Sequence, residues 1–170
     1  KSTLLKDPLK PTTIKVRLVS QNQQIVRADF EENFDISAES LVSAATNFDR
    51  IDTVILSDYD KGLLADPQAL IKEYVSRKIP VLVDPKHKDF SLYQGATLVK
   101  PNIKELRNAI GNWDSEQEMI KKVKSLLEKF SWSALLITRA SDGMTLVEPG
   151  AETHFPARTR DVYDTSGAGD

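Results

Sequence analysis

Four short, mainly apolar runs alternate along the chain with stretches of helical periodicity, and this alternation constrains the fold more than any other feature. The runs occupy residues 53–56, 81–83, 96–99 and 134–137. A run of this kind, as at residues 53–56, is typical of a strand buried on both faces of a parallel sheet. Strands that alternate with helices build βαβ units, so we expect an α/β fold with a mostly parallel sheet flanked by helices.

Residues between the runs carry recognisable signals for the ends of helices. A helical composition covers residues 37 to about 48, and Asp66 followed by Pro67 indicates an N-cap with proline at the first helical position. Asn102 opens a short helix that is predicted to end near Gly111. Ser115 and Glu118 form a capping-box pattern, which indicates the start of another helix. An apolar segment at residues 144–147 is expected to be a strand that pairs with the preceding run at residues 134–137.

The first thirty residues depart from this alternation. Apolar and polar residues alternate from Ile14 to Val19, and a second segment at residues 24–30 follows a short polar connection, which together predict a β-hairpin. One face would carry Ile14, Val16 and Leu18. The other would carry Lys15 and Arg17, joined by Arg27 if the register allows. Such a hairpin is either an edge ribbon of the sheet or a lid.

Composition excludes several classes of protein. The chain has 25 acidic and 23 basic residues, a formal net charge of −2, which gives no electrostatic footprint for nucleic acid or an anionic membrane. No apolar run reaches the roughly 18–20 residues of a membrane-spanning helix. The absence of cysteine from the sequence excludes a disulfide framework, a thiolate nucleophile and a cysteine zinc site. We therefore expect a cytoplasmic enzyme or binding domain that binds neither nucleic acid nor membrane.

Polar side chains follow each of the four apolar runs. Ligands of parallel sheets bind outside the carboxyl ends of the strands, so these side chains are candidates for binding a phosphorylated ligand. The alternative is that strand-to-helix loops are polar only because they are solvated. The residues concerned are Asp58, Lys61, Asp84, Lys86, Lys100, Asn102, Thr138 and Arg139.

The last seven residues, 164–170, combine small residues with a final carboxylate. Glycine and alanine at 167–169 let a backbone approach a ligand closely, and the N–H groups of a following helix would face an anion. Asp170 beside that anion is suited to act as a general base for a hydroxyl that attacks a phosphoryl group. The alternative is a tight turn before a helix, where the helix dipole favours Asp170.

Residues 164–170 resemble the C-terminal signature of the ribokinase-like (PfkB) carbohydrate kinases. Residues 102–105 resemble the N-x-x-E motif of this family, and residues 138–143 resemble its nucleotide-side turn. Segments 15–24, 56–62 and 83–86 are similar to the heptose-7-phosphate kinases of lipopolysaccharide synthesis, a branch that includes bifunctional enzymes with an adenylyltransferase domain. The resemblance spans essentially the whole chain, but no H-x-G-H nucleotidyltransferase motif is present.

The resemblance implies a role for each matching residue. Asp170 would be the catalytic base, with the backbone of Gly167, Ala168 and Gly169 as the anion hole. Glu105 would contact magnesium through the water shell of the metal. Asn102 and Glu105 also form a plain capping box, and both interpretations can hold together. The implied ATP-binding residues are Asn102, Ile103, Lys104, Glu105, Thr138, Arg139 and Gly143, and the implied substrate-binding residues are Asp58, Lys61, Asp84, Lys86, Arg17 and Arg27.

The resemblance also implies an organisation and a reaction. Residues 14–31 would be the hairpin lid of a ribokinase-like core at residues 36–170, and residues 1–170 an incomplete kinase domain of a longer protein that is poorly active or inactive alone. The full enzyme would use ATP and Mg²⁺ to phosphorylate the anomeric hydroxyl of a heptose 7-phosphate, as a homodimer. Two alternatives remain: a ribokinase-like kinase for another sugar, such as ribose or fructose, and a non-catalytic phosphosugar-binding domain.

Overall fold

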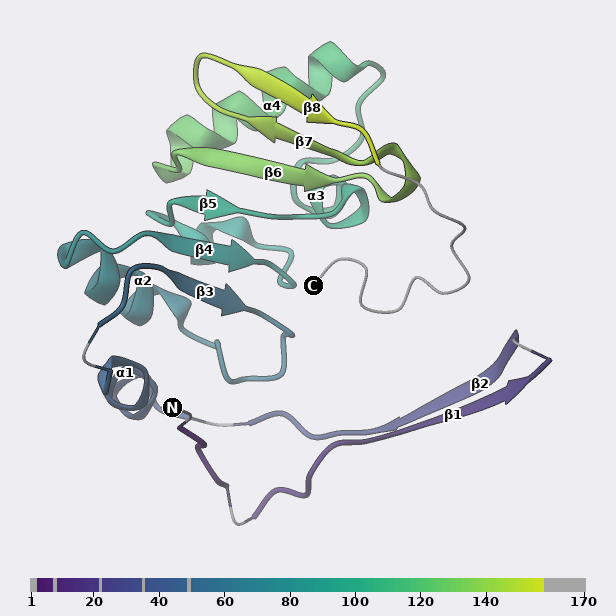
Figure 1. Ribbon diagram of the computed structural model, residues 1–170, viewed down its shortest axis with the longest axis vertical. Coiled ribbons are helices and arrows are strands. Elements are labelled where there is room, and N and C mark those ends of the chain that lie inside the picture. Colours follow the sequence, from purple (N-terminus) through teal and green to yellow (C-terminus); the bar gives the residue numbers. More distant parts are fainter. Residues whose placement is uncertain (1–2, 8, 22, 35, 49, 158–170) are drawn as a thin grey trace.

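A six-stranded sheet forms the body of the molecule (Figure 1). The structure, a computed structural model, describes residues 3–7, 9–21, 23–34, 36–48 and 50–157. In spatial order the strands are β3 (Val54–Ser57), β4 (Val81–Asp84), β5 (Leu98–Val99), β6 (Ala134–Thr138), β7 (Met144–Val147) and β8 (Glu152–Phe155). The first four are parallel, and β7 and β8 add antiparallel strands at one side. This confirms the predicted α/β fold with a mostly parallel sheet.

Helices begin where the sequence predicted their caps. They are α1 (Ala38–Thr46), α2 (Pro67–Ser76), α3 (Ile103–Ile110) and α4 (Glu116–Phe130), with 3₁₀ turns η1 (Phe90–Tyr93) and η2 (Ala140–Asp142). Asn102 forms a complete capping box with Glu105. Ser115 caps α4, but the carboxylate of Glu118 accepts from the amide of Asp114 instead of completing the predicted box. In the described part of the chain, no helix has the length and apolar character needed to cross a membrane.

The core lies between one face of the sheet and the helices. Val83, Val99 and Leu135 occupy this face and are almost completely buried against side chains such as Leu106 and Met119. The opposite face carries Leu82, Leu98 and Leu136, which are half-buried, and Ile55, which is 70% exposed. The prediction that residues 53–56 are buried on both faces is therefore wrong for Ile55. β3 is the outermost of the described strands of this sheet. The helices pack against the face opposite to the one that carries Ile55.

The predicted strand at residues 96–99 is reduced to Leu98–Val99. Ala96 is not extended, because its amide donates to the carbonyl of Tyr93 at 3.1 Å and closes the turn after η1. Thr97 still contacts the neighbouring strand, since its amide donates to the Val81 carbonyl at 2.8 Å. The sequence pattern did not anticipate β8 or η1.

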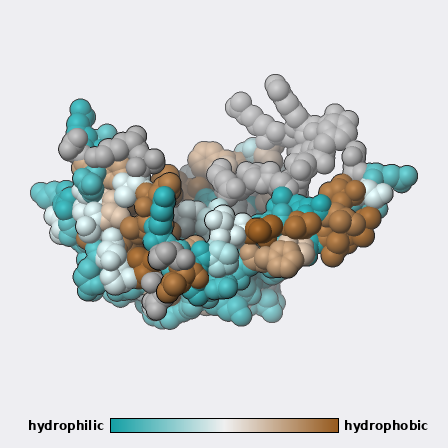
Figure 2. Space-filling view, turned by 90° about the horizontal axis from the view of Figure 1, so that it is seen from below, coloured by the Kyte–Doolittle hydropathy of each residue, from teal (hydrophilic) through white to brown (hydrophobic). Residues whose placement is uncertain are grey.

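The hairpin, formed by β1 (Ile14–Ser20) and β2 (Gln23–Phe30), is a separate two-stranded sheet. It is not an edge of the main sheet, and it extends from the body on the side to which the parallel strands point (Figure 1). The register places Arg17 opposite Arg27, so the predicted joining of Arg27 to Lys15 and Arg17 on one face is confirmed. The other face is apolar and exposed, and its side chains gather at the right in Figure 2; they are Ile14, Val16, Leu18, Val26, Ala28 and Phe30.

A close backbone contact joins the end of the hairpin to the loop after β3. The amide of Phe34 donates to the carbonyl of Lys61 at 2.8 Å. The next residue, Gly62, has φ +90°, and a Cβ there would lie 1.9 Å from the Phe34 carbonyl oxygen. Only glycine fits this crossing.

We predict that Gly62→Ala destabilises the protein more than Gly111→Ala does. Gly111 has a comparable φ of +77°, but a Cβ added to it would meet no atom within 4 Å. The loss of stability in Gly111→Ala therefore measures the cost of backbone strain alone. That strain costs about 1–3 kcal/mol of unfolding free energy, and the clash with Phe34 adds to it at Gly62. Urea denaturation measures both variants, and equal losses would contradict the close contact.

Candidate active site at the carboxyl ends of the parallel strands

The ends of β3, β4 and β5 are joined by hydrogen bonds and an ion pair. The amide of Asp58 donates to the carbonyl of Asp84 at 2.9 Å. The carboxylate of Asp84 in turn pairs with Lys100, with 3.0 Å between Oδ2 and Nζ. Parallel strands end at one edge of the sheet, which we call the carboxyl edge, and this brings together residues that are distant in sequence.

The N-terminus of α3 lies at the same edge, between β4 and β6. Asn102 Oδ1 accepts from the Glu105 amide at 2.9 Å, and Glu105 Oε2 accepts from the Asn102 amide at 3.0 Å. The remaining oxygen of Glu105 faces Lys86, with 3.5 Å between Oε1 and Nζ. Thr138 lies beside this cap, since its amide donates to the Pro101 carbonyl at 3.0 Å.

Of the residues predicted for ATP binding, Asn102, Glu105 and Thr138 thus lie at this cap, and Ile103 and Lys104 follow in the first turn of α3. Ile103 is half-buried against the core, whereas Lys104 is exposed. The cap interpretation of Asn102 and Glu105 is confirmed, and Glu105 Oε1 is not used in the cap but faces Lys86.

Arg139 is held against α4 by a residue that the sequence pattern did not reveal. Its guanidinium donates to both carboxylate oxygens of Glu116, at 2.6 and 2.8 Å, and to Thr145 Oγ1 at 3.2 Å. The hydrogen bond and charge of Glu116 raise the pKa of Arg139. The carbonyl of Gly143 accepts from the Arg139 amide at 2.8 Å, and a Cβ at Gly143, which has φ +86°, would lie 2.0 Å from the Phe155 carbonyl oxygen. The guanidinium is therefore fixed in position between the start of α4 and β7.

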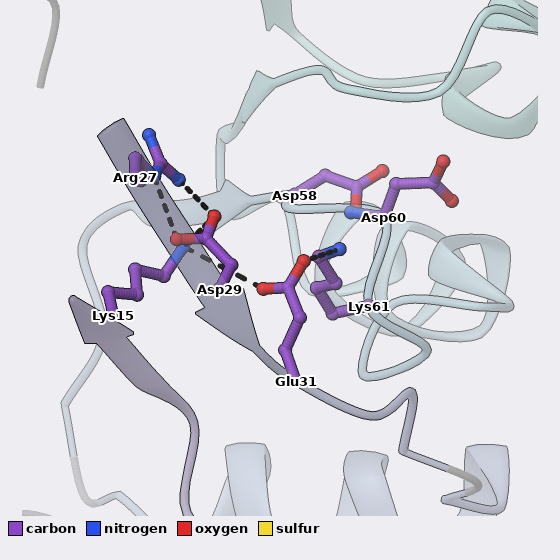
Figure 3. Close-up of polar contacts among 7 residues, drawn as sticks. All are labelled: Lys15, Arg27, Asp29, Glu31, Asp58, Asp60 and Lys61. Carbon is purple, nitrogen blue, oxygen red and sulfur yellow. Dashed lines mark hydrogen bonds and ion pairs between the residues drawn. The ribbon is translucent and has the colours of Figure 1, made fainter. Parts of the chain in front are cut away.

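The polar face of the hairpin contains a network of charges that reaches the loop after β3 (Figure 3). Arg27 donates to both oxygens of Asp29, at 2.8 and 2.5 Å. Lys15 bridges the two hairpin carboxylates, at 3.8 Å from Asp29 and 3.7 Å from Glu31. Glu31 also accepts a hydrogen bond from Lys61, which belongs to the loop after β3. This ion pair joins the hairpin to the carboxyl edge.

The same contacts set the protonation of the hairpin carboxylates. The hydrogen bond from Arg27 holds the pKa of Asp29 below its ordinary value, and the Lys15 and Arg17 charges contribute. The hydrogen bond from Lys61 likewise lowers the pKa of Glu31. Sequence reasoning missed Asp29 and Glu31, although the hairpin register places Asp29 directly opposite Lys15. Arg17 lies opposite Arg27 and forms no ion pair within 4 Å among the described residues.

The predicted base Asp170 and the predicted anion hole at Gly167, Ala168 and Gly169 lie outside the described residues and stay predictions. Within the described residues, no group of three or more His, Cys, Asp or Glu side chains is arranged to hold a metal ion directly. Glu105, with one oxygen in the cap and the other near Lys86, fits a contact through a metal-bound water better than direct ligation.

The fold and the position of the candidate site define a ribokinase-like α/β protein. Among solved structures, the chain is similar to Arabidopsis thaliana ribokinase complexed with ribose and ATP, with a TM-score of 0.67 and 19% identity. The match covers 95% of this chain and 54% of that one, and at this identity it shows the fold alone. The chain belongs to the pfkB family of carbohydrate kinases, whose family model matches residues 2–170.

Curated relatives are more similar in sequence. The chain is 44% identical over 164 residues to the "Bifunctional protein HldE" of Shewanella sediminis, and 46% identical over the same length to that of Shewanella amazonensis. Each match covers 95% of this chain and 34% of the relative. The chain therefore spans about a third of the length of these relatives.

We predict that Lys61→Met raises the pKa of Glu31 toward the ordinary value of about 4.3. The lowered pKa in the folded protein means that the Glu31–Lys61 contact stabilises the hairpin above the ordinary pKa, and that this contribution is lost as the pH falls through the lowered one. An NMR titration of the Glu31 carboxyl measures the shift. Lys15→Met is the control and should have a smaller effect, because Lys15 lies 3.7 Å from Glu31. A larger effect of Lys15→Met would contradict the assignment.

Proposed function

We propose that the protein is an ATP-dependent kinase that phosphorylates the anomeric hydroxyl of a heptose 7-phosphate. The observation that carries this proposal is a set of three contacts along the carboxyl edge: Lys86 with Glu105 of the α3 cap, Asp58 with Asp84, and Lys61 with Glu31 of the hairpin. Such a set offers adjacent places for a nucleotide and a sugar. Membership of the pfkB family supports phosphoryl transfer, and similarity to the HldE proteins, together with segments 15–24 and 56–62, supports a heptose phosphate as the acceptor.

The two substrates would divide the site between them. ATP would lie near the α3 cap and Thr138, with Gly143 and Arg139 at the far side. The sugar would lie near Asp58 and Asp84, beneath the hairpin. In this arrangement residues 14–31 act as a lid on the core of residues 36–170.

The phosphate already present on the sugar would bind to the cationic residues of the hairpin. Arg17 and Arg27 share one face, and the planar fork of arginine matches the oxygens of a phosphate. Arg27 is paired with Asp29. A phosphate dianion carries more charge than this carboxylate, so it competes well for the same donors. Lys61 and Lys86 would add positive charge on the core side.

Catalysis would combine positioning, one base and electrostatic stabilisation. Asp170 takes the proton of the attacking sugar hydroxyl. The oxygen of that hydroxyl bonds to the γ-phosphorus, and ADP leaves. The N–H groups at Gly167, Ala168 and Gly169 stabilise the charge on the phosphoryl oxygens. Magnesium bound with ATP would neutralise phosphate charge, and Glu105 would accept a hydrogen bond from its water shell through Oε1.

The proposal predicts that the natural full-length protein phosphorylates heptose 7-phosphate with ATP, and that Asp170→Asn lowers kcat about 10²–10⁴-fold while ligand binding persists. A coupled ADP-release assay measures turnover, and titration calorimetry measures binding. Glu152→Gln, on exposed β8, is the control and should leave kcat unchanged.

The other outcomes separate the alternatives. Faster turnover of ribose or a fructose phosphate would assign a different sugar. Binding of a sugar phosphate without turnover, unchanged in Asp170→Asn, would identify a non-catalytic binding domain.

We also propose that the enzyme is a homodimer in which two hairpins pack through their apolar faces. A two-stranded hairpin has no core of its own, and Val16, Leu18 and Phe30 are 44%, 54% and 63% exposed. A second copy presents the same face, and two-fold symmetric contacts between identical surfaces are the commonest form of assembly.

This proposal predicts that Val16→Lys converts the full-length protein to a monomer in analytical ultracentrifugation, because it places a charge in the paired apolar faces. Val75→Lys is the matched control: Val75 is as exposed as Val16, at 44%, but lies on α2, away from the hairpin. A monomeric wild type, or equal effects of the two variants, would contradict the apolar-face dimer.

A further inference from the structure

Tyr93 places a buried hydroxyl directly beneath the candidate site. It is the last residue of η1 and is completely buried. Its ring packs against Phe90, with 6.2 Å between the ring centroids. Its backbone is also fixed, because the indole N–H of Trp132 donates to the Tyr93 carbonyl at 2.7 Å. The core therefore determines where the hydroxyl lies.

That hydroxyl connects the loops that follow β3 and β4. It donates to Asp58 Oδ2 at 2.5 Å and accepts from the amide of His87 at 3.3 Å. The other carboxylate oxygen of Asp58, Oδ1, accepts from the amide of Asp60 at 2.8 Å. Each oxygen of Asp58 is thus held by one donor, and each keeps a lone pair for a further one.

The direction of the Tyr93–Asp58 hydrogen bond is fixed by the surroundings of the tyrosine. Burial raises the pKa of Tyr93 far above its ordinary value, and the hydrogen bond to Asp58 raises it further. The hydroxyl therefore keeps its proton and donates it. Asp58, half-buried at the carboxyl edge, presents an oriented acceptor to the space beneath the hairpin.

We propose that Tyr93 is a positioning residue that orients the Asp58 carboxylate to accept a hydrogen bond from a hydroxyl of the sugar substrate. Tyr93 itself does not touch the sugar. An unsupported aspartate in a loop samples several rotamers, and ordering one of them on binding weakens affinity. A carboxylate held in place beforehand avoids that loss. The inference rests on the proposed kinase function and assigns a role to a residue outside the substrate contacts.

The test compares Tyr93→Phe with Tyr74→Phe in the natural full-length protein. Tyr74 is also buried, at 2% exposure, and its hydroxyl donates to the carbonyl of Ala45 at 2.7 Å, away from the carboxyl edge. Both variants lose one buried hydroxyl and keep the ring. Tyr93→Phe should raise the KM for the sugar phosphate about tenfold and leave kcat and the KM for ATP within about twofold. Tyr74→Phe should leave all three unchanged.

A double variant tests whether Tyr93 acts through Asp58. Once Asp58→Ala has removed the acceptor of the Tyr93 hydroxyl, adding Tyr93→Phe should raise the KM for the sugar no further. A tenfold additional rise would overturn the inference, because Tyr93 would then act by another route. An unchanged KM in the Tyr93→Phe single variant would also overturn it.

Amide hydrogen exchange separates this inference from the proposed function. Tyr93→Phe should speed exchange at Asp60 and His87, whose amides depend on Asp58 Oδ1 and the Tyr93 hydroxyl, and Tyr74→Phe should not. Unchanged exchange at both amides overturns the inference whether or not the enzyme is active. A wild type that transfers no phosphoryl group to any sugar overturns the proposed function, and the role of Tyr93 toward a sugar with it.

Discussion

Close packing of aliphatic side chains on the covered face of the parallel sheet is the constraint on which the site depends. Val83, Val99 and Leu135 are partners in register on adjacent strands and are at most 1% exposed. Each such side chain contributes about 1.5–3 kcal/mol by burial. Because side chains alternate between the two faces, a slip of one residue would turn these side chains out of the core. The packing therefore determines where each strand ends, and with it the positions of Asp84 and Lys100.

The charges at the carboxyl edge are paired, and under the proposed function this pairing would serve ligand binding more than stability. Lys61, Lys86, Lys100 and Arg139 each face a carboxylate. Ion pairs in contact with solvent, as these are, contribute little to stability. What they provide is orientation, since each cation is held at the edge of the sheet while its partner can be exchanged for a phosphate oxygen. The proposed site, which would bind ATP and a sugar phosphate together, would need this property.

The sequence predicted the elements with strong local signals and missed those set by distant contacts. Asn102, Asp66 and Ser115 cap their helices as expected, because an N-cap depends only on residues within one turn. Tyr93 was missed because a single tyrosine after a polar loop carries no periodic signal, and its meaning depends on Asp58, 35 residues away. Likewise, Glu31 and Lys61 meet only because the hairpin folds over the loop after β3. The predicted roles of the residues at 167–170 rest on the motif, since these residues lie outside the described ones.

The hairpin explains why binding and assembly would be linked in this protein. A two-stranded sheet is too thin to bury either of its faces by itself, so both must be stabilised by contacts from outside. On the polar face that contact is the Glu31–Lys61 ion pair, with Lys15 bridging Asp29 and Glu31. On the apolar face it would be a second hairpin. Since Arg17 and Val16 are neighbours on opposite faces of one strand, packing that orders the apolar face also orders the side chains proposed to hold the sugar phosphate. On this view the second copy contributes to the site without providing any residue that touches the substrate.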